Sequence, residues 1–285
     1  PLTASWFNQP LNVDFSTKEG AKAYQVAVNL NGNWQPAKTG VLPAAVNEAL
    51  SGSVAWDGKV GIDLPYHAGA TYNVELNGDL KNVSSHLPSP LAKPAGEPLP
   101  VNVKVDGNLN SFDLTGQAGA DNHFNSRWLL GQKLTLDRAI WAADSKTLPP
   151  LPEQSGVELN MPPMNGAEWL ALFQKGAAES VGGAASFPQH ITLRTPMLSL
   201  GNQQWNNLSI VSQPTANGTQ VEAQGREINA TLAMRNNAPW LANIKYLYYN
   251  PSVAKTLGDS TPSSPFPTTE RINCRGWPDA QIRCA

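Results

Sequence analysis

The sequence predicts a mostly β protein, and three observations carry that prediction. Short runs alternate apolar and polar residues, as in the INATLAM stretch from Ile228 to Met234. Side chains along a strand project to opposite faces, so such a run gives a strand with one apolar and one polar face. Gly, Pro and Asn separate the runs at spacings of about 8–12 residues, which is typical of all-β architectures. With 23 Gly and 24 Pro but only 15% charged residues, against roughly 25% in ordinary domains, we expect many turns, few helices and a long, one-sided antiparallel sheet.

The elements follow from this pattern in chain order. Pro-rich segments at 87–100 and 147–156 predict crossovers rather than central strands, because Pro lacks an amide donor. Residues 258–285 read as a linker followed by a cysteine loop. Strands are predicted near residues 10–16, 22–31, 54–65, 70–78, 101–107, 110–117, 126–138, 156–161, 190–195, 197–201, 204–212, 219–224, 227–235 and 242–249.

Two short helices are predicted, near 43–51 and 165–175. The first begins at Pro43, which suits a first helical turn, and Gly52 can end it. The second carries an apolar stripe from Trp169 to Phe173. We expect that stripe to pack on the sheet, and a lid over an open groove is the alternative.

Composition limits the possible partners and the compartment. A net charge of −2 gives no basic footprint for nucleic acid, and no run approaches the ~20 apolar residues that span a bilayer. The chain starts at Pro1 without a signal pattern, so we expect a fragment of a longer protein. Cys274 and Cys284 are spaced for a disulfide worth about 2–3 kcal/mol, although two reduced thiols fit the spacing as well.

Catalytic constellations are missing from the sequence. The four histidines, at 67, 86, 123 and 190, do not have metal-ligand spacing, and neither HExxH nor GxSxG occurs. No dinucleotide or phosphate-binding fingerprint occurs, and the carboxylates are scattered singly. We therefore expect no enzyme activity, no cofactor and no metal. The nine tryptophans leave one alternative open, a carbohydrate-binding or adhesive extracytoplasmic β-sandwich with exposed rings.

Residues 190–249 supply a family resemblance. The strand TPMLSLGNQQWNNLSI, the hairpin NGTQVEAQGREINATLAM and the tyrosine-rich IKYLYYN resemble the C-terminal region of AsmA-like proteins, and FDLTGQAGADNHFNSRWLLGQKLTLDRAIWAADSK resembles the large envelope members of that family. The resemblance implies an elongated, highly curved, repeat-built sheet that forms a U-shaped hydrophobic groove over residues 1–285. It further implies a periplasmic location, an inner-membrane anchor outside this chain, and conduction of phospholipid between the inner and outer membranes of a Gram-negative bacterium.

On this reading the functional residues form a surface, although a sealed core is the alternative for any one of them, and a spacer covered by a partner chain is a third option. Glycines such as Gly61, Gly107, Gly116 and Gly201 are expected to allow bending. The predicted groove residues are Tyr24, Val26, Val28, Val60, Ile62, Leu64, Tyr72, Val74, Leu76, Val101, Val103, Val105, Phe112, Leu114, Leu134, Leu136, Ile191, Leu193, Leu198, Leu200, Ile210, Ile228, Leu232 and Met234.

Overall fold

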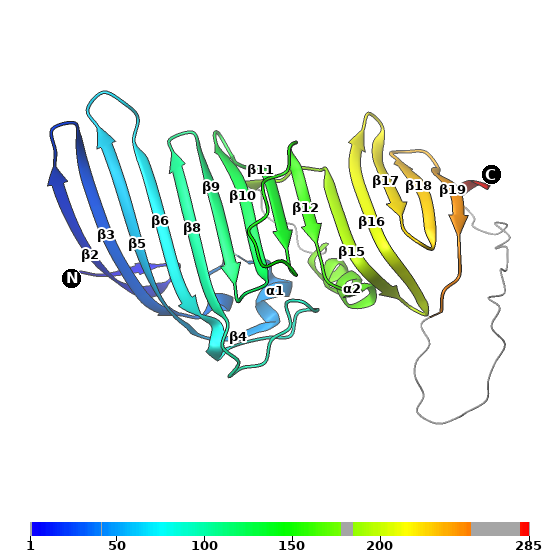
Figure 1. Cartoon of the computed structure of the whole chain (residues 1–285), viewed down its shortest axis with the longest axis horizontal. Coiled ribbons are helices and arrows are strands. Elements are labelled where there is room, and N and C mark those ends of the chain that lie inside the picture. Colours follow the sequence, from blue (N-terminus) through cyan, green and yellow to red (C-terminus); the bar gives the residue numbers. More distant parts are fainter. Residues whose placement is uncertain (1, 41, 178–184, 252–279, 285) are drawn as a thin grey trace. The chain divides into compact units, whose positions relative to one another are not determined.

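The computed structural model describes residues 2–40, 42–177, 185–251 and 280–284 (Figure 1). The chain divides into two compact units, the first made of residues 1–160 and 168–188 and the second of residues 161–167 and 189–285. Cys274 lies outside the described residues, and the side chain of Cys284 is not described either. The proposed disulfide therefore stays a prediction.

The first unit is built on a sheet in which strands that follow one another in the sequence pair side by side. Their pairing from β1 to β11 is antiparallel throughout, and Figure 1 shows the long strands as a row of neighbouring arrows. The alternating sequence produces these strands, and the short turns between most of them fix their register. The strands of this sheet are β1 (Leu2–Trp6), β2 (Gln9–Glu19), β3 (Ala23–Trp34), β5 (Val54–Pro65), β6 (Thr71–Asp79), β8 (Pro100–Asn108), β9 (Ser111–Ala118), β10 (Asn122–Leu130), β11 (Leu134–Ala142), β12 (Gly156–Asn160) and β14 (Ala185–Ser186).

The mostly β prediction is confirmed, but the sheet is mixed rather than wholly antiparallel. Strand β11 pairs in parallel with β12 and, nearer its start, with β14. Parallel neighbours need a long connection, and the segment between β11 and β12 provides one. This connection includes the predicted Pro-rich crossover at 147–156, where the Nδ2 of Asn125 donates to the Pro149 carbonyl at 2.9 Å.

The second unit is a smaller sheet in which strands that follow one another in the sequence again pair side by side. Strands β15 to β19 pair antiparallel in chain order, while β13 pairs in parallel with β15, and β20 pairs in parallel with β19. The long strand β15 runs through Pro196, where the sequence predicted a break. The strands are β13 (Met164–Asn165), β15 (Ile191–Leu200), β16 (Gln203–Thr215), β17 (Gly218–Gln224), β18 (Ile228–Arg235), β19 (Trp240–Leu247) and β20 (Ala280–Cys284).

Short elements of the first unit gather around the connections on either side of β5 and β6. They are the helix α1 (Ala44–Glu48), the 3-10 turns η1 (Pro36–Lys38) and η2 (Leu80–Asn82), and a two-stranded sheet of β4 (Leu50–Gly52) with β7 (Val83–Ser85). The helix α1 is shorter than the predicted 43–51 because its last residues join β4. In the described part of the chain, no helix has the length and apolar character that crossing a bilayer requires.

The helix α2 (Gly166–Ala177) does not bury its apolar stripe against the sheet, which corrects the expected packing. Trp169 Nε1 donates to the Ser89 carbonyl at 3.0 Å, and Lys175 pairs with Glu48 of α1. Leu170 and Phe173 remain 48% and 64% exposed. At about 100° per residue, Trp169 and Leu172 lie on one face and are half-buried, whereas Leu170 lies about 100° from Trp169 and points away from that face.

Candidate functional site

The register of the first unit places all sixteen predicted groove residues up to Leu136 on one face of its sheet. Directly paired residues project to the same side, so each cross-strand row can be followed from β2 to β11. One row joins Val26, Ile62, Tyr72, Gly107, Phe112, Trp128 and Leu136. A second row, separated from the first by one row between them, joins Leu30, Gly58, Leu76, Val103, Gly116, Phe124 and Trp141. We call this side of the sheet the apolar face.

The middle row of the apolar face is continuous. It consists of Phe15, Val28, Val60, Val74, Val105 and Leu114, one from each of β2, β3, β5, β6, β8 and β9. At about 4.8 Å between strands, a row across these strands is roughly 24 Å long. It therefore forms an apolar track that runs across the strands rather than along any one of them.

This face is not a sealed core. In the long strands β2, β3, β5, β6, β8 and β9, Leu11 is the one apolar residue of the described structure whose side chain is buried. Phe15 is 62% exposed and Leu64 is 39% exposed, while the valines of the middle row are half-buried by their neighbours. An apolar surface of this extent on a protein marks a binding or interaction site.

Glycines on the apolar face make room for large neighbours. A Cβ at Gly107 would lie 2.6 Å from the Cβ of Phe112 and 2.8 Å from the Tyr72 ring. A Cβ at Gly58 would lie 2.6 Å from a methyl group of Leu76. The alternation of glycine with large side chains across the strands therefore evens out the surface of the face.

The opposite face of the same sheet is polar. One row joins Asn12, Asn31, Asp57, Asn77, Asn102 and Gln117, and Asn102 Nδ2 donates to Asn77 Oδ1 at 2.6 Å. Arg127 donates to both carboxylate oxygens of Asp113, at 2.7 and 2.8 Å, and these hydrogen bonds lower the pKa of Asp113. The sheet of the first unit thus carries polar side chains on one face and mostly apolar side chains on the other.

The open part of the apolar face ends at β10 and β11. Ser126 follows Leu114 in the middle row; it is fully buried, donates to the Leu114 carbonyl at 3.0 Å and accepts from Trp128 Nε1 at 3.0 Å. The Trp128 ring stacks on Phe112 and meets Phe187 edge-on. Beyond this aromatic group β11 supplies buried side chains, including Leu136 and Ala139.

In the second unit, the pairing separates the predicted groove residues into two sets. Ile191, Leu193, Ile210, Ile228, Leu232 and Met234 share one face through the register of β15 to β18. Leu198 and Leu200 alternate with Leu193 along β15 and so belong to the opposite face. The prediction that they share a face with Ile228 and Leu232 is wrong, because β15 continues through Pro196 without an extra residue that would reset the alternation.

A buried carboxylate fixes one end of the second unit. Glu227 is 3% exposed and accepts from the Asn206 backbone N at 2.6 Å, from Asn206 Nδ2 at 2.7 Å and from Asn250 Nδ2 at 3.0 Å. Burial alone would raise the pKa of Glu227, but these hydrogen bonds outweigh it and leave the pKa below its ordinary value. It is a structural anchor, and among the described residues no cluster of side chains suited to a metal ion occurs.

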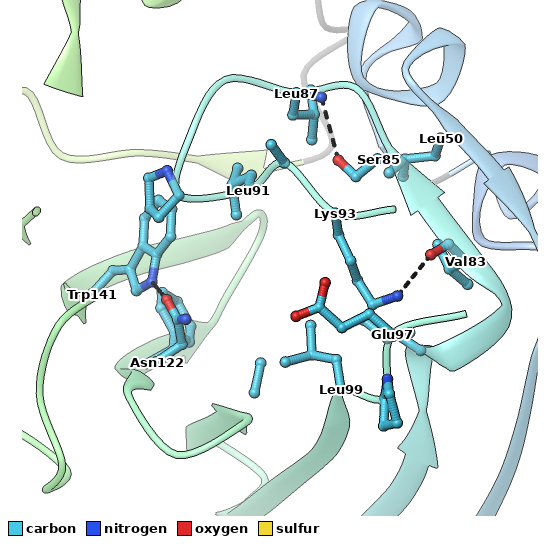
Figure 2. Close-up of a pocket in the computed structure, with 16 residues that line it drawn as sticks. Leu50, Val83, Ser85, Leu87, Leu91, Lys93, Glu97, Leu99, Asn122 and Trp141 are labelled. Carbon is cyan, nitrogen blue, oxygen red and sulfur yellow. Dashed lines mark hydrogen bonds between the residues drawn. The ribbon is translucent and has the colours of Figure 1, made fainter. Parts of the chain in front are cut away.

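Sequence reasoning missed two parts of the site. Leu11, Val13 and Phe15 lie on the apolar face, and the same alternation in β2 would have identified them. The second part is a pocket of about 460 Å³ lined by the crossover from Leu80 to Leu99 and by the ends of β9, β10 and β11 (Figure 2). No sequence signal shows that this Pro-rich crossover folds back over the sheet.

A wide sheet with one hydrated side and one half-exposed apolar side defines a class of protein that presents an extended hydrophobic binding surface. The family model described as "YhdP protein" matches residues 1–285, and the chain belongs to that family. The chain is 98% identical over 284 residues to "Intermembrane phospholipid transporter YhdP" of Escherichia coli (strain K12). The match covers 100% of this chain and 22% of that relative. The chain thus spans about a fifth of the relative's length, and no solved structure matches it. The predicted family resemblance is confirmed.

Proposed function

We propose that this chain is a segment of a bridge that conducts phospholipid between the two membranes of the bacterial envelope, with the acyl chains lying on the apolar face. The observation that carries the proposal is the continuous middle row from Phe15 to Leu114, which is apolar on six neighbouring strands and is not sealed by other elements of the described structure. The name of the 98% identical relative, an intermembrane phospholipid transporter, supports the same reading.

The energetics favour a surface of this kind. Moving a tail of about 16 carbons through water costs on the order of 12 kcal/mol, at about 0.8 kcal/mol per methylene. A row of similar apolar side chains about 24 Å long offers contact along most of a tail as the tail moves from strand to strand. The polar face of the same sheet, with rows of Asn, Asp and Lys, gives no such contact.

Location and partners follow from this role. Transport between membranes requires that the chain lie in the periplasm, and we place its inner-membrane anchor and its outer-membrane contact in parts of the protein beyond this segment. In this proposal the segment curves so that the apolar face lines a trough and headgroups remain at the hydrated rim. It needs no catalytic step, since lipid is moved without a change in covalent bonds.

The alternative of a carbohydrate-binding β-sandwich has less support in the first unit. A sandwich packs two sheets about 10 Å apart with their apolar faces together. The described residues of this unit form one broad sheet and a second sheet of only two strands, β4 and β7. Of the tryptophans, Trp34 and Trp56 lie on the apolar face with their rings 4.8 Å apart, rather than on the polar one.

The test is lipid capture by the purified chain. We expect phospholipid to copurify with it, and a photo-reactive residue in place of Val103 to crosslink lipid. The matched control is a probe at Lys104, the next residue on β8, which lies on the polar face. Copurified lipid together with capture at Val103 and not at Lys104 supports the proposal, whereas a lipid-free chain with no capture at Val103 refutes it.

A further inference from the structure

The pocket under the crossover has walls held by several hydrogen bonds. The Ser85 and Lys93 backbones exchange hydrogen bonds of 2.8 and 2.9 Å, and the Leu80 N donates to the Leu99 carbonyl at 2.9 Å. The Leu99 N in turn donates to the Asp79 carboxylate at 2.8 Å. The crossover is therefore anchored at both ends, so the pocket exists before any ligand arrives.

The lining of the pocket is mainly apolar and is continuous with the apolar face. Leu50, Leu87 and Leu91 come from the surrounding segments, and Ala118 and Phe124 come from the sheet. Ala118 pairs with Val101, and Phe124 pairs with Gly116, so both sheet residues belong to cross-strand rows of the apolar face. A tail on the face can therefore enter the pocket without crossing water, and the volume of about 460 Å³ lies in the range of small-ligand sites.

The charged groups of the pocket are not equivalent (Figure 2). The Lys93 ammonium donates to the Val83 carbonyl at 3.0 Å and to the Pro94 carbonyl at 2.9 Å, so two of its three hydrogens are already engaged. Glu97 also lines the pocket, and it is exposed. The exposed Glu97 carboxylate thus adds a negative charge to the lining, whereas the Lys93 ammonium keeps its positive charge but has one hydrogen left for a ligand.

We infer that this pocket seats the end of one acyl chain of a phospholipid whose headgroup carries an ammonium group, with Glu97 meeting that ammonium. The inference rests on the proposed function and deepens it, since it names a resting site and a preferred headgroup. An exposed ion pair is worth at most about 1 kcal/mol, which corresponds to a preference of about fivefold. The tail contributes most of the affinity and the carboxylate contributes the selectivity.

The experiment uses the whole purified chain with a photo-reactive residue at Leu91 in the pocket or at Val28 on the open face. It is exposed to vesicles of phosphatidylethanolamine or of phosphatidylglycerol. We expect the Leu91 probe to capture the ethanolamine lipid about fivefold more, and Glu97→Gln to reduce that ratio to near one. The Val28 probe should capture both lipids alike in either background.

Two variants separate the pocket from the face. Ala118→Trp fills the pocket and should abolish capture at Leu91 but not at Val28, while Ala27→Trp on the polar face should change neither. Capture at Val28 with none at Leu91 overturns the pocket inference and leaves the proposed function standing. Equal capture of the two lipids at Leu91 in the unsubstituted chain overturns the headgroup preference, and failure at both positions refutes the proposed function as well.

Discussion

Placing one charge in the middle of the apolar row should interrupt lipid binding. Val74 pairs with Val60 on one side and with Val105 on the other, so Val74→Asp puts a carboxylate at the centre of the row. A hydrated carboxylate prevents contact over one strand spacing of about 4.8 Å, or roughly four methylenes. At about 0.8 kcal/mol per methylene and with contact on one side of the tail only, the loss is about 1.5 kcal/mol, or about tenfold in occupancy.

The control is Asn73→Asp, which adds the same charge one residue away, on the polar face of the same strand. Phospholipid bound per mole of purified chain, measured by mass spectrometry, should fall about tenfold for Val74→Asp and stay unchanged for Asn73→Asp. Circular dichroism and thermal unfolding establish that both variants are folded. If folded Val74→Asp retains as much lipid as Asn73→Asp does, the apolar row does not carry the tails.

Three further predictions concern stability. Gly107→Ala should cost about 1–3 kcal/mol in thermal unfolding, because its Cβ meets the Cβ of Phe112 at 2.6 Å, whereas Gly69→Ala, with nothing within 4 Å, should cost little. Because the pKa of Glu227 is lower in the folded chain than its ordinary 4.5, its stabilisation is present above that pH and lost as the pH falls through the folded value. Protection against hydrogen exchange across the second unit should decrease as the pH falls through this range. Glu227→Gln should abolish that pH dependence and should lower the free energy of unfolding by about 1–3 kcal/mol at neutral pH. A double-mutant cycle on Asp113 and Arg127, whose side chains are 39% and 38% exposed, should give less than about 1 kcal/mol and decrease with salt; a larger, salt-independent value would contradict this.

The alternation of the sequence was sufficient to assign the face of residues from Tyr24 to Leu136. In the first unit most strands are joined by short turns, so a strand that alternates correctly also pairs in the expected register with its neighbour. The β-bulge between Arg127 and Trp128 shifts the pairing by one residue, yet Trp128 still pairs with Leu136, so the assignment survives there. Across this sheet, the alternation within each strand therefore predicts the same face for a residue as the pairing between strands does.

The sequence failed where tertiary connections decide the outcome. Pro196 read as a break between two strands, which hid the alternation that separates Leu198 from Leu193. The parallel pairing of β11 with β12 and β14 depends on long connections whose path the sequence does not encode locally. The pocket of Leu91 and Glu97 arises in the same way, from a crossover that folds back over the sheet.

A scan of single positions along β5 shows whether lipid lies on one face of the sheet or on both. Photo-reactive residues placed singly at Lys59, Val60, Gly61, Ile62 and Asp63 alternate between the polar and apolar faces. We expect phospholipid crosslinks at Val60 and Ile62 and none at Lys59, Gly61 or Asp63. Equal crosslinking at all five positions, or crosslinks to the polar positions, would contradict this expectation.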